Sequence, residues 1–247
     1  MIVKKGGNMI YEIAGLRILI ENRCKFTENF CEKYLSADQN SPYDIATKVT
    51  NEEFYAEKAL SENFSDGYIE NICIYRGICR QLPVLNRMLL HAAVLQIDGN
   101  AYAFLGRSGT GKSTHTGLWL KYLENAKIVN GDKPIIGYTN SEFVAYGTPW
   151  NGKEGLGENT QAPLKGLCFL EQAKENAIRR LKPSEAATRI FNQILFPEDE
   201  ENVSKTLELT DKLVTEVPCY LLQCDISEEA MKLSYEMMTG KTYRLVK

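Results

Sequence analysis

The sequence predicts an α/β fold in which a mixed β-sheet carries a glycine-rich loop and a small β-containing lobe precedes it. The loop is the segment Gly106–Ser113. An apolar run at 101–105 leads into it and a helical pattern at 113–123 follows it. A second apolar run, 88–97, is joined to the first by Asp98-Gly99-Asn100, and Asp-Gly between two such runs is typical of a β-hairpin. The strand that enters the loop should therefore have an antiparallel neighbour, which favours a mixed sheet over a purely parallel one.

We expect two domains, a small N-terminal α+β lobe over residues 1–85 and a larger α/β domain over residues 86–247. In the N-terminal part, hydrophobic alternation predicts the strands, and capping patterns predict where helices begin. In chain order the expected elements are a strand pair within 9–20, a helix that begins at Thr27, a strand at 43–49, a short helix after the capping box Thr50–Glu53, and a helix at 67–81 that ends near Pro83. No residue of this part suggests a chemical role.

In the larger domain, short apolar runs and serine caps predict the elements that follow the glycine-rich loop. They are strands at 128–129, 135–136, 143–145, 167–170, 177–181 and 220–223, and helices that begin at Ser184, Ser204 and Ser227. The segment Gly147–Gln161 joins two of these strands, contains several glycines and spans fifteen residues. Because most connections are shorter, we expect a functional loop here, with Lys153 as a candidate contact to phosphate.

The composition is that of an ordinary globular protein, since 44% of the 247 residues are hydrophobic and 25% are charged. A net charge of −3 without a basic stripe argues against a nucleic-acid partner. The uncharged run Met88–Ile97 is about half the ~20 residues that a membrane-spanning helix needs. No secretory signal is recognisable, so we expect a cytoplasmic protein without a membrane partner. The seven cysteines include no C-x-x-C pair, which indicates reduced core residues and neither zinc nor redox chemistry.

The glycine-rich loop satisfies every fixed position of the pattern G-x-x-x-x-G-K-[ST]. Its glycines allow backbone N–H groups to surround a phosphate, Lys112 can reach the β- and γ-phosphates, and the Ser113 hydroxyl can bind Mg²⁺. The positive end of the following helix would face the same anion. The residues that we expect to bind the nucleotide are Gly106, Arg107, Ser108, Gly109, Thr110, Gly111, Lys112, Ser113 and Thr114.

Phosphoryl transfer also needs a carboxylate near the phosphates, and Asp132 is the main candidate. It follows a short apolar strand twenty residues after Lys112, where it can bind Mg²⁺ or accept a proton from a substrate hydroxyl. The alternative is a structural Asp in an Asn-Gly-Asp turn. Glu171 is a rival, because an apolar strand that ends in an acid holds Mg²⁺ in many phosphate-loop ATPases. We favour a solvated strand-end acid for Glu171.

Only two histidines occur in the chain. His91 falls inside the strand that is expected to pair with the one entering the loop. A histidine there is usually structural, but the hairpin would bring it close to the phosphates. His115 falls on the first turn of the helix after the loop, and we expect a partly exposed surface residue.

The run from Leu90-His91-Ala92 through the glycine-rich loop to Asn130-Gly131-Asp132 resembles the catalytic domain of the HPr serine kinase/phosphorylase family, which is akin to the ATP-dependent phosphoenolpyruvate carboxykinases. The resemblance covers residues 88–171. It implies a mixed-sheet P-loop domain of the HPr kinase/phosphoenolpyruvate carboxykinase type that uses ATP and Mg²⁺. It also implies that His91, Lys112, Ser113 and Asp132 form the active site, with Asp132 taking the proton of the substrate hydroxyl.

The chain departs from that family in three respects. Where relatives carry two adjacent acids, it has Gly131-Asp132-Lys133. The family's later Mg²⁺-binding Glu precedes a Gly-Leu-Gly, and here both Glu154 and Glu158 are open, with Glu154 grouped with Ser113 and Asp132 as the metal ligands. No Arg can be given a catalytic role.

We therefore expect an ATP- and Mg²⁺-dependent kinase that transfers the γ-phosphoryl group to a hydroxyl of a peptide, a protein or a small molecule. Two alternatives stay open. One is a nucleotide-binding regulatory or assembly module with little turnover, which the missing second acid motivates. The other is a generic P-loop ATPase that relies on Glu171. A homo-oligomer is possible because relatives form rings or dimers, and ATP is favoured over GTP by the resemblance alone.

Overall fold

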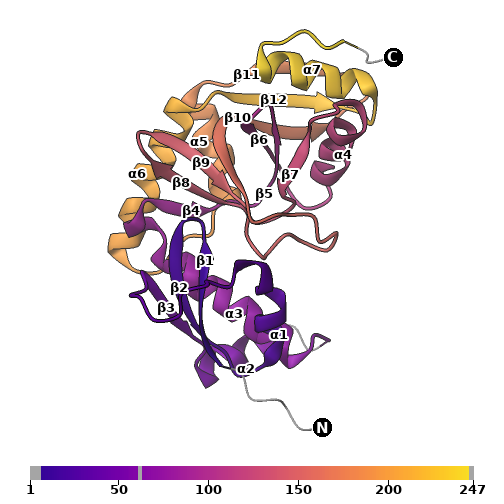
Figure 1. Cartoon of the computed structure of the whole chain (residues 1–247). Helices are drawn as coiled ribbons and strands as arrows, with labels where there is room; N and C mark the ends of the chain where they lie inside the picture. Colours follow the sequence, from indigo (N-terminus) through magenta and orange to yellow (C-terminus); the bar gives the residue numbers. More distant parts are fainter. Residues whose placement is uncertain (1–6, 61–62, 245–247) are drawn as a thin grey trace.

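The computed structural model describes residues 7–60 and 63–244, which form two lobes with one β-sheet each (Figure 1). The N-terminal lobe comprises β1 (Asn8–Ile13), β2 (Leu16–Glu21), α1 (Lys25–Phe30), η1 (Glu32–Tyr34), β3 (Ile45–Lys48), α2 (Asn51–Leu60) and α3 (Asp66–Gln81). Its sheet has the order β1-β2-β3, with β1 antiparallel and β3 parallel to β2. The expected strand pair is thus confirmed, and its turn uses positive φ angles at Ala14 (55°) and Gly15 (70°).

The helices of the N-terminal lobe follow the capping patterns with one exception. The capping box is confirmed, because the Thr50 N–H donates to the Glu53 carboxylate (2.9 Å) and the Glu53 N–H donates to Thr50 Oγ1 (3.2 Å) at the start of α2. The prediction that Thr27 begins a helix is wrong. α1 begins two residues earlier because the Glu70 carboxylate, on α3, accepts the N–H of Cys24 (2.8 Å) at its start.

The C-terminal lobe contains the remaining elements. They are η2 (Pro83–Leu85), β4 (Arg87–Leu89), β5 (Ala92–Ile97), β6 (Asn100–Leu105), α4 (Lys112–Tyr122), β7 (Lys127–Asn130), β8 (Ile135–Thr139), β9 (Glu142–Tyr146), β10 (Gln161–Gln172), β11 (Ala177–Arg180), α5 (Pro183–Ile190), η3 (Phe191–Gln193), α6 (Glu200–Glu216), β12 (Cys219–Cys224) and α7 (Glu228–Thr239). Their sheet has the order β4-β8-β9-β10-β6-β5-β7, with β12 beside β10 and β11 beside β12.

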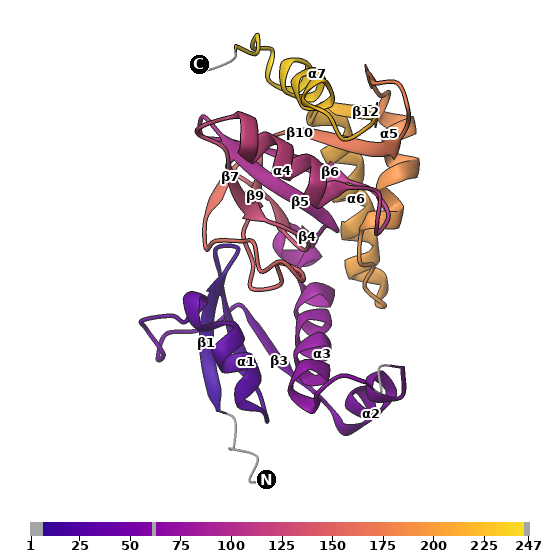
Figure 2. The ribbon, with the colours of Figure 1, turned by 90° about the vertical axis from the view of Figure 1, so that its right-hand side faces the viewer.

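The sheet of the C-terminal lobe is mixed, as expected. β6 pairs antiparallel with β5 and parallel with β10, so the strand that enters the glycine-rich loop has one neighbour of each kind. α4 and α7 lie on one face of the sheet, and α5 and α6 lie on the other (Figure 2). Along β6 the side chains alternate accordingly: Tyr102 and Phe104 pack toward α4 and α7, and Ala103 packs toward α5 and α6.

Several expected bounds in this lobe need correction. The run 88–97 is interrupted at Leu90 and His91, because Leu90 bridges to Ile194 and the chain passes there from β4, which pairs with β8, to β5, which pairs with β6. The strand expected at 167–170 extends over all of β10, since β9, β6 and β12 supply partners along its length.

Two of the three predicted helix starts in this lobe are wrong. α5 begins at Pro183, and α6 begins at Glu200, where the Asp199 carboxylate accepts the N–H of Asn202 (2.9 Å). The prediction for Ser227 is confirmed, since its hydroxyl accepts the Ala230 N–H (3.2 Å) at the start of α7.

The two lobes share an apolar cluster in which residues of β1, β2, β3 and α3 pack with Leu89, Ile135, Tyr146 and Trp150. The division into domains at residue 85 stays a prediction.

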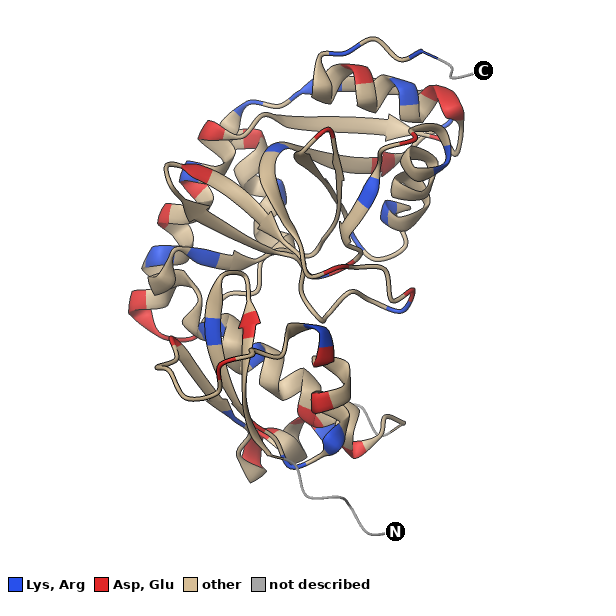
Figure 3. Cartoon of the chain, viewed as in Figure 1, with Lys and Arg blue, Asp and Glu red and all other residues tan. Residues whose placement is uncertain are grey.

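Over the described residues, no helix has both the length and the apolar character needed to span a bilayer. All seven cysteines are free, five of them buried. Basic and acidic residues are interspersed along both lobes (Figure 3), and the absence of a nucleic-acid partner stays a prediction.

Candidate functional site

The glycine-rich loop connects the end of β6 to the start of α4. Gly109 and Gly111 have φ angles of 82° and 102°, which residues with a side chain rarely adopt, so the backbone needs glycine there. Thr110 Oγ1 donates to the carbonyl oxygen of Arg107 (2.7 Å) and braces the turn. Lys112 is the first residue of α4 and is buried, and its Nζ donates to the Gly106 carbonyl oxygen (2.8 Å). Burial lowers the pKa of Lys112.

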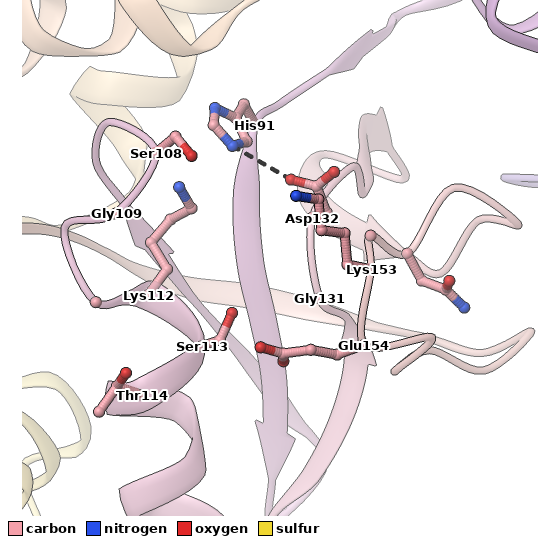
Figure 4. Close-up of a pocket in the computed structure, with 13 residues that line it drawn as sticks. His91, Ser108, Gly109, Lys112, Ser113, Thr114, Gly131, Asp132, Lys153 and Glu154 are labelled. Atoms are coloured by element: carbon pink, nitrogen blue, oxygen red, sulfur yellow. Dashed lines mark ion pairs between the residues drawn. The ribbon is translucent and has the colours of Figure 1, made fainter. Parts of the chain in front are cut away.

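The loop forms one side of a cavity of about 430 Å³ (Figure 4). Residues of the turn after β7, of the Leu90–His91 break and of the 147–160 loop form the other side. The lining residues are His91, Ser108, Gly109, Gly111, Lys112, Ser113, Thr114, Gly131, Asp132, Asn151, Gly152, Lys153 and Glu154. The structure therefore brings together most of the residues that the sequence singles out. Gly106, Arg107 and Thr110 instead line a second cavity of about 290 Å³.

Asp132 is held in a tight turn directly after β7. The Oδ1 atom of Asn130 accepts the backbone N–H groups of Asp132 (2.9 Å) and Lys133 (2.7 Å). The Nδ2 atom of the same buried Asn130 donates to the carbonyl oxygen of Thr148 (3.1 Å). Asn130 thus fixes the turn and joins it to the long loop. Sequence reasoning treated Asn130 only as a turn residue.

The Asp132 carboxylate has a basic partner on each oxygen. His91 Nε2 lies 3.2 Å from Oδ1, and Lys133 Nζ pairs with Oδ2. Burial acts to raise the pKa of Asp132, but the hydrogen bonds from His91 and Lys133 outweigh it and lower the pKa to about 2. Asp132 is therefore an anion at neutral pH. Each oxygen can still accept another hydrogen bond, because a carboxylate oxygen has two lone pairs.

His91 does not lie within a strand, as the sequence suggested, but at the break between β4 and β5. Its backbone N–H donates to the Gln193 carbonyl oxygen (2.7 Å). The side-chain amide of Gln193 meets the carbonyl oxygens of His91 (3.2 Å) and Gly106 (3.1 Å), and we orient it so that its nitrogen donates to both, because two carbonyl oxygens can only accept. The buried Gln193 therefore connects His91 to the first residue of the glycine-rich loop. Nothing in the sequence pointed to Gln193.

The three candidate glutamates lie in different surroundings. Glu154 lines the cavity and extends toward Ser113 from the opposite side (Figure 4). Glu158 is not among the residues that line this cavity, and its backbone N–H donates to Val129 (3.2 Å). Glu171 forms an ion pair with Arg189 (2.7 Å) and lines the second cavity. Within 7–60 and 63–244, no group of three or more His, Cys, Asp and Glu side chains is arranged to hold a metal by itself.

The 147–160 loop packs directly against the Asp132 turn. The Gly131 N–H donates to the Leu156 carbonyl oxygen (2.9 Å). Gly152 has a φ angle of 81°, and a Cβ atom added to it would lie 2.9 Å from the Cβ of Asp132. The loop therefore helps to set the position of Asp132, and it brings Lys153 and Glu154 to the cavity.

A comparison with protein-family models matches residues 68–232 to "SynChlorMet cassette protein ScmC". The chain belongs to the ScmC family. The matched range begins within α3 and ends within α7, so it includes every residue that lines the 430 Å³ cavity. A search of curated proteins finds no match to this ScmC-family chain.

Among solved structures, one that resembles this ScmC-family chain is the "Hpr(Ser) kinase/phosphatase from Coxiella burnetii". It is 14% identical, with a TM-score of 0.29, and the alignment covers 50% of this chain and 87% of that one. A TM-score of this size does not establish a shared fold. The resemblance to HPr kinases stays an expectation that depends on the motifs.

The prediction that His115 of this ScmC-family chain is a partly exposed surface residue is wrong. This residue is buried because α4 packs against α7 and places the His115 Nε2 atom 2.9 Å from Ser234 Oγ. Its ring centroid lies 4.9 Å from that of Phe104. Burial lowers the pKa of His115 to about 4, so the imidazole is neutral at pH 7. His115 stabilises the packing of α4 beside the loop.

Proposed function

We propose that this protein is a kinase that binds ATP with Mg²⁺ and transfers the γ-phosphoryl group to a hydroxyl. The observation that carries the proposal is that Lys112 and Ser113 of the glycine-rich loop line the same cavity as the His91–Asp132 pair. A phosphate-binding loop supplies positive charge and backbone donors, and a carboxylate opposite it can take a proton from an acceptor.

The cavities around the loop suit a whole nucleotide better than a free phosphate. A cavity of about 530 Å³ lies beside the first turn of α4 and shares Gly109, Gly111 and Thr114 with the 430 Å³ cavity. Leu118 and Ile226 are among its lining residues. Apolar side chains of this kind favour a base and ribose, while the glycine-rich loop favours phosphates. We assign the nucleoside to this neighbouring cavity.

The residues present also fit Mg²⁺. The metal prefers oxygen ligands and usually keeps water and phosphate oxygens among them, so two protein oxygens are sufficient. Ser113 and Glu154 supply a hydroxyl and a carboxylate from opposite sides of the cavity. When bound, Mg²⁺ would neutralise charge on the phosphates. We assign Asp132, which the sequence also groups with the metal ligands, to the acceptor proton, because its carboxylate is held by His91 and Lys133 and still has free lone pairs.

In the transfer step, the acceptor oxygen forms a bond to the γ-phosphorus while the bond from that phosphorus to the β–γ bridging oxygen breaks. ADP leaves with the electron pair of the broken bond, and the proton of the acceptor hydroxyl moves to Asp132. An aspartate with a pKa of about 2 is a weak base, so it takes this proton as the new bond forms and does not generate a free alkoxide beforehand. His91 positions the carboxylate, and Lys112 stabilises charge on the transferred group.

A second candidate function is a nucleotide-binding module with little transfer. It is favoured by the pairing of both Asp132 oxygens and by the single acid in Gly131-Asp132-Lys133. A generic ATPase that relies on Glu171 has less support, because Glu171 pairs with Arg189 in the second cavity.

The test is to incubate the protein with ATP radiolabelled at the γ-phosphate, Mg²⁺ and a lysate of the source cells. The wild type should label an acceptor. Lys112→Ala should lose both nucleotide binding and labelling, whereas Asp132→Asn should bind ATP and lose labelling by about 10²-fold or more. ATP binding without any labelled acceptor would favour the module, and labelling by Asp132→Asn at the wild-type rate would refute the role of Asp132.

A further inference from the structure

A third cavity, of about 240 Å³, lies between the lobes; we call it the interlobe pocket. Among the residues that line it are Tyr75, Leu89, His91, Lys133, Ile194 and Leu195. Tyr75 comes from α3 of the N-terminal lobe and the others come from the C-terminal lobe. Both lobes therefore contribute to the wall of this pocket.

The interlobe pocket adjoins the proposed site of transfer. His91 lines both the interlobe pocket and the 430 Å³ cavity. Lys133, on the wall of the interlobe pocket, pairs with the carboxylate of Asp132, which lines the larger cavity. A molecule in the interlobe pocket would thus contact His91 without occupying the glycine-rich loop, none of whose residues lines this pocket. A phosphoryl acceptor needs this arrangement, because it must approach the carboxylate without displacing the phosphates.

The walls of the pocket define the chemistry of its occupant. Leu89, Ile194 and Leu195 are apolar, and Tyr75 adds a ring whose centroid lies 5.8 Å from that of Trp150. Asn192 and Gln193 add uncharged amides to the wall. The cation of Lys133 is neutralised by Asp132 and lies 5.8 Å from the Tyr75 ring centroid. Lys133 therefore has no unpaired charge with which to bind an anion. The volume of about 240 Å³ is below the usual range for a whole ligand, about 300–1,000 Å³, so it suits one group of side-chain size.

We propose that the interlobe pocket binds the acceptor, and that the acceptor carries its hydroxyl on an uncharged, ring-sized apolar group such as a phenol. This inference rests on the proposed kinase function. The apolar group would contact Tyr75 and Leu195, and the hydroxyl would face His91, at the boundary with the 430 Å³ cavity that Asp132 lines. The N-terminal lobe then contributes to acceptor selection through α3, which gives this lobe a role that its sequence did not suggest.

The test uses 4-methylphenol as the probe, with glycerol as a hydroxyl compound that lacks the apolar group. Binding is measured by saturation-transfer NMR without nucleotide, and phosphate transfer from ATP is measured separately. The protein should bind 4-methylphenol and not glycerol. Tyr75→Ala should weaken binding of 4-methylphenol by about tenfold and raise its KM in transfer by a similar factor, with the KM for ATP unchanged within about twofold.

Three variants keep the test decisive. Tyr55→Ala removes an exposed tyrosine of α2 that is outside the pocket, and it should bind 4-methylphenol like the wild type. If Tyr75→Ala does not fold, Leu195→Trp, which fills the pocket, should block binding instead. Lys112→Ala should lose ATP binding but still bind 4-methylphenol, because Lys112 does not line the interlobe pocket. A wild type that binds 4-methylphenol but not ATP would refute the kinase without refuting the pocket proposal. Absent binding of 4-methylphenol, or equal binding by Leu195→Trp, would overturn the pocket proposal even if ATP binds.

Discussion

Replacing Asp132 by asparagine should lower the stability of the protein as well as its transfer activity. The change removes the negative charge of the Asp132 carboxylate. His91 Nε2 lies 3.2 Å from one oxygen of this carboxylate, and Lys133 pairs with the other. A pKa lowered from 3.8 to about 2 corresponds to about 2 kcal/mol of stabilisation by the ionised form in the folded state. The side chain is only 23% exposed, so solvent screens these interactions incompletely. We therefore expect Asp132→Asn to cost about 2 kcal/mol at pH 7.

The pH dependence of this cost has a definite sign. Because the folded-state pKa of Asp132 is below the unfolded value, its stabilisation is complete above about pH 4 and is lost as the pH falls toward about 2. Urea unfolding of the wild type and of Asp132→Asn, measured from pH 7 to pH 3, should give free energies of unfolding whose difference is largest at neutral pH and shrinks below pH 4.

Asp98→Asn is a matched control. Asp98 pairs with Lys241 (2.7 Å), but both side chains are largely exposed, and an exposed ion pair stabilises by less than about 1 kcal/mol. Its removal should cost clearly less than that of Asp132. Equal free energies of unfolding for the wild type and Asp132→Asn at pH 7, or a constant difference down to pH 3, would refute the pairing of Asp132 as described.

Three further predictions concern the surroundings of the site. Because burial lowers the pKa of His115 to about 4, the wild type should lose roughly 3 kcal/mol of stability between pH 6.5 and pH 4, and His115→Gln should lack this part of the pH dependence in urea unfolding. Gly152→Ala should reduce transfer by about tenfold or more and spare ATP binding, because the added Cβ would displace Asp132; Gly155→Ala, also at positive φ (65°) but with open space around it, controls for backbone strain in the same kinetic assay. Glu154→Gln should raise the Mg²⁺ concentration needed for half-maximal ATP binding by about tenfold, and Glu158→Gln should leave it unchanged in the same titration.

Features set by neighbouring residues could be predicted from the sequence. The hairpin at Asp98–Gly99 and the caps at Thr50 and Ser227 depend on interactions within a few residues, and each is found as expected. The glycine-rich loop likewise joins a strand to a helix, as its pattern required.

Features that depend on distant parts of the chain could not be predicted. α1 begins before Thr27 because Glu70, 46 residues after Cys24, accepts its N–H. His115 is buried because Ser234, 119 residues further on, packs against it. Gln193 holds His91 through a 3₁₀ turn that no local pattern connects to the hairpin. That Glu154 and not Glu158 lines the cavity depends on how the long loop packs on the Asp132 turn. In each case the deciding interaction is tertiary.

The proposed function requires that the cavity beside Lys112 binds a nucleoside triphosphate. Titration calorimetry with ATP and Mg²⁺ measures this directly, with the wild type and Lys112→Ala in parallel. We predict one site per chain with a Kd of about micromolar order in the wild type, and binding weakened by at least about a hundredfold in Lys112→Ala. No heat of binding with the wild type, or equal affinities for the two proteins, would contradict the account.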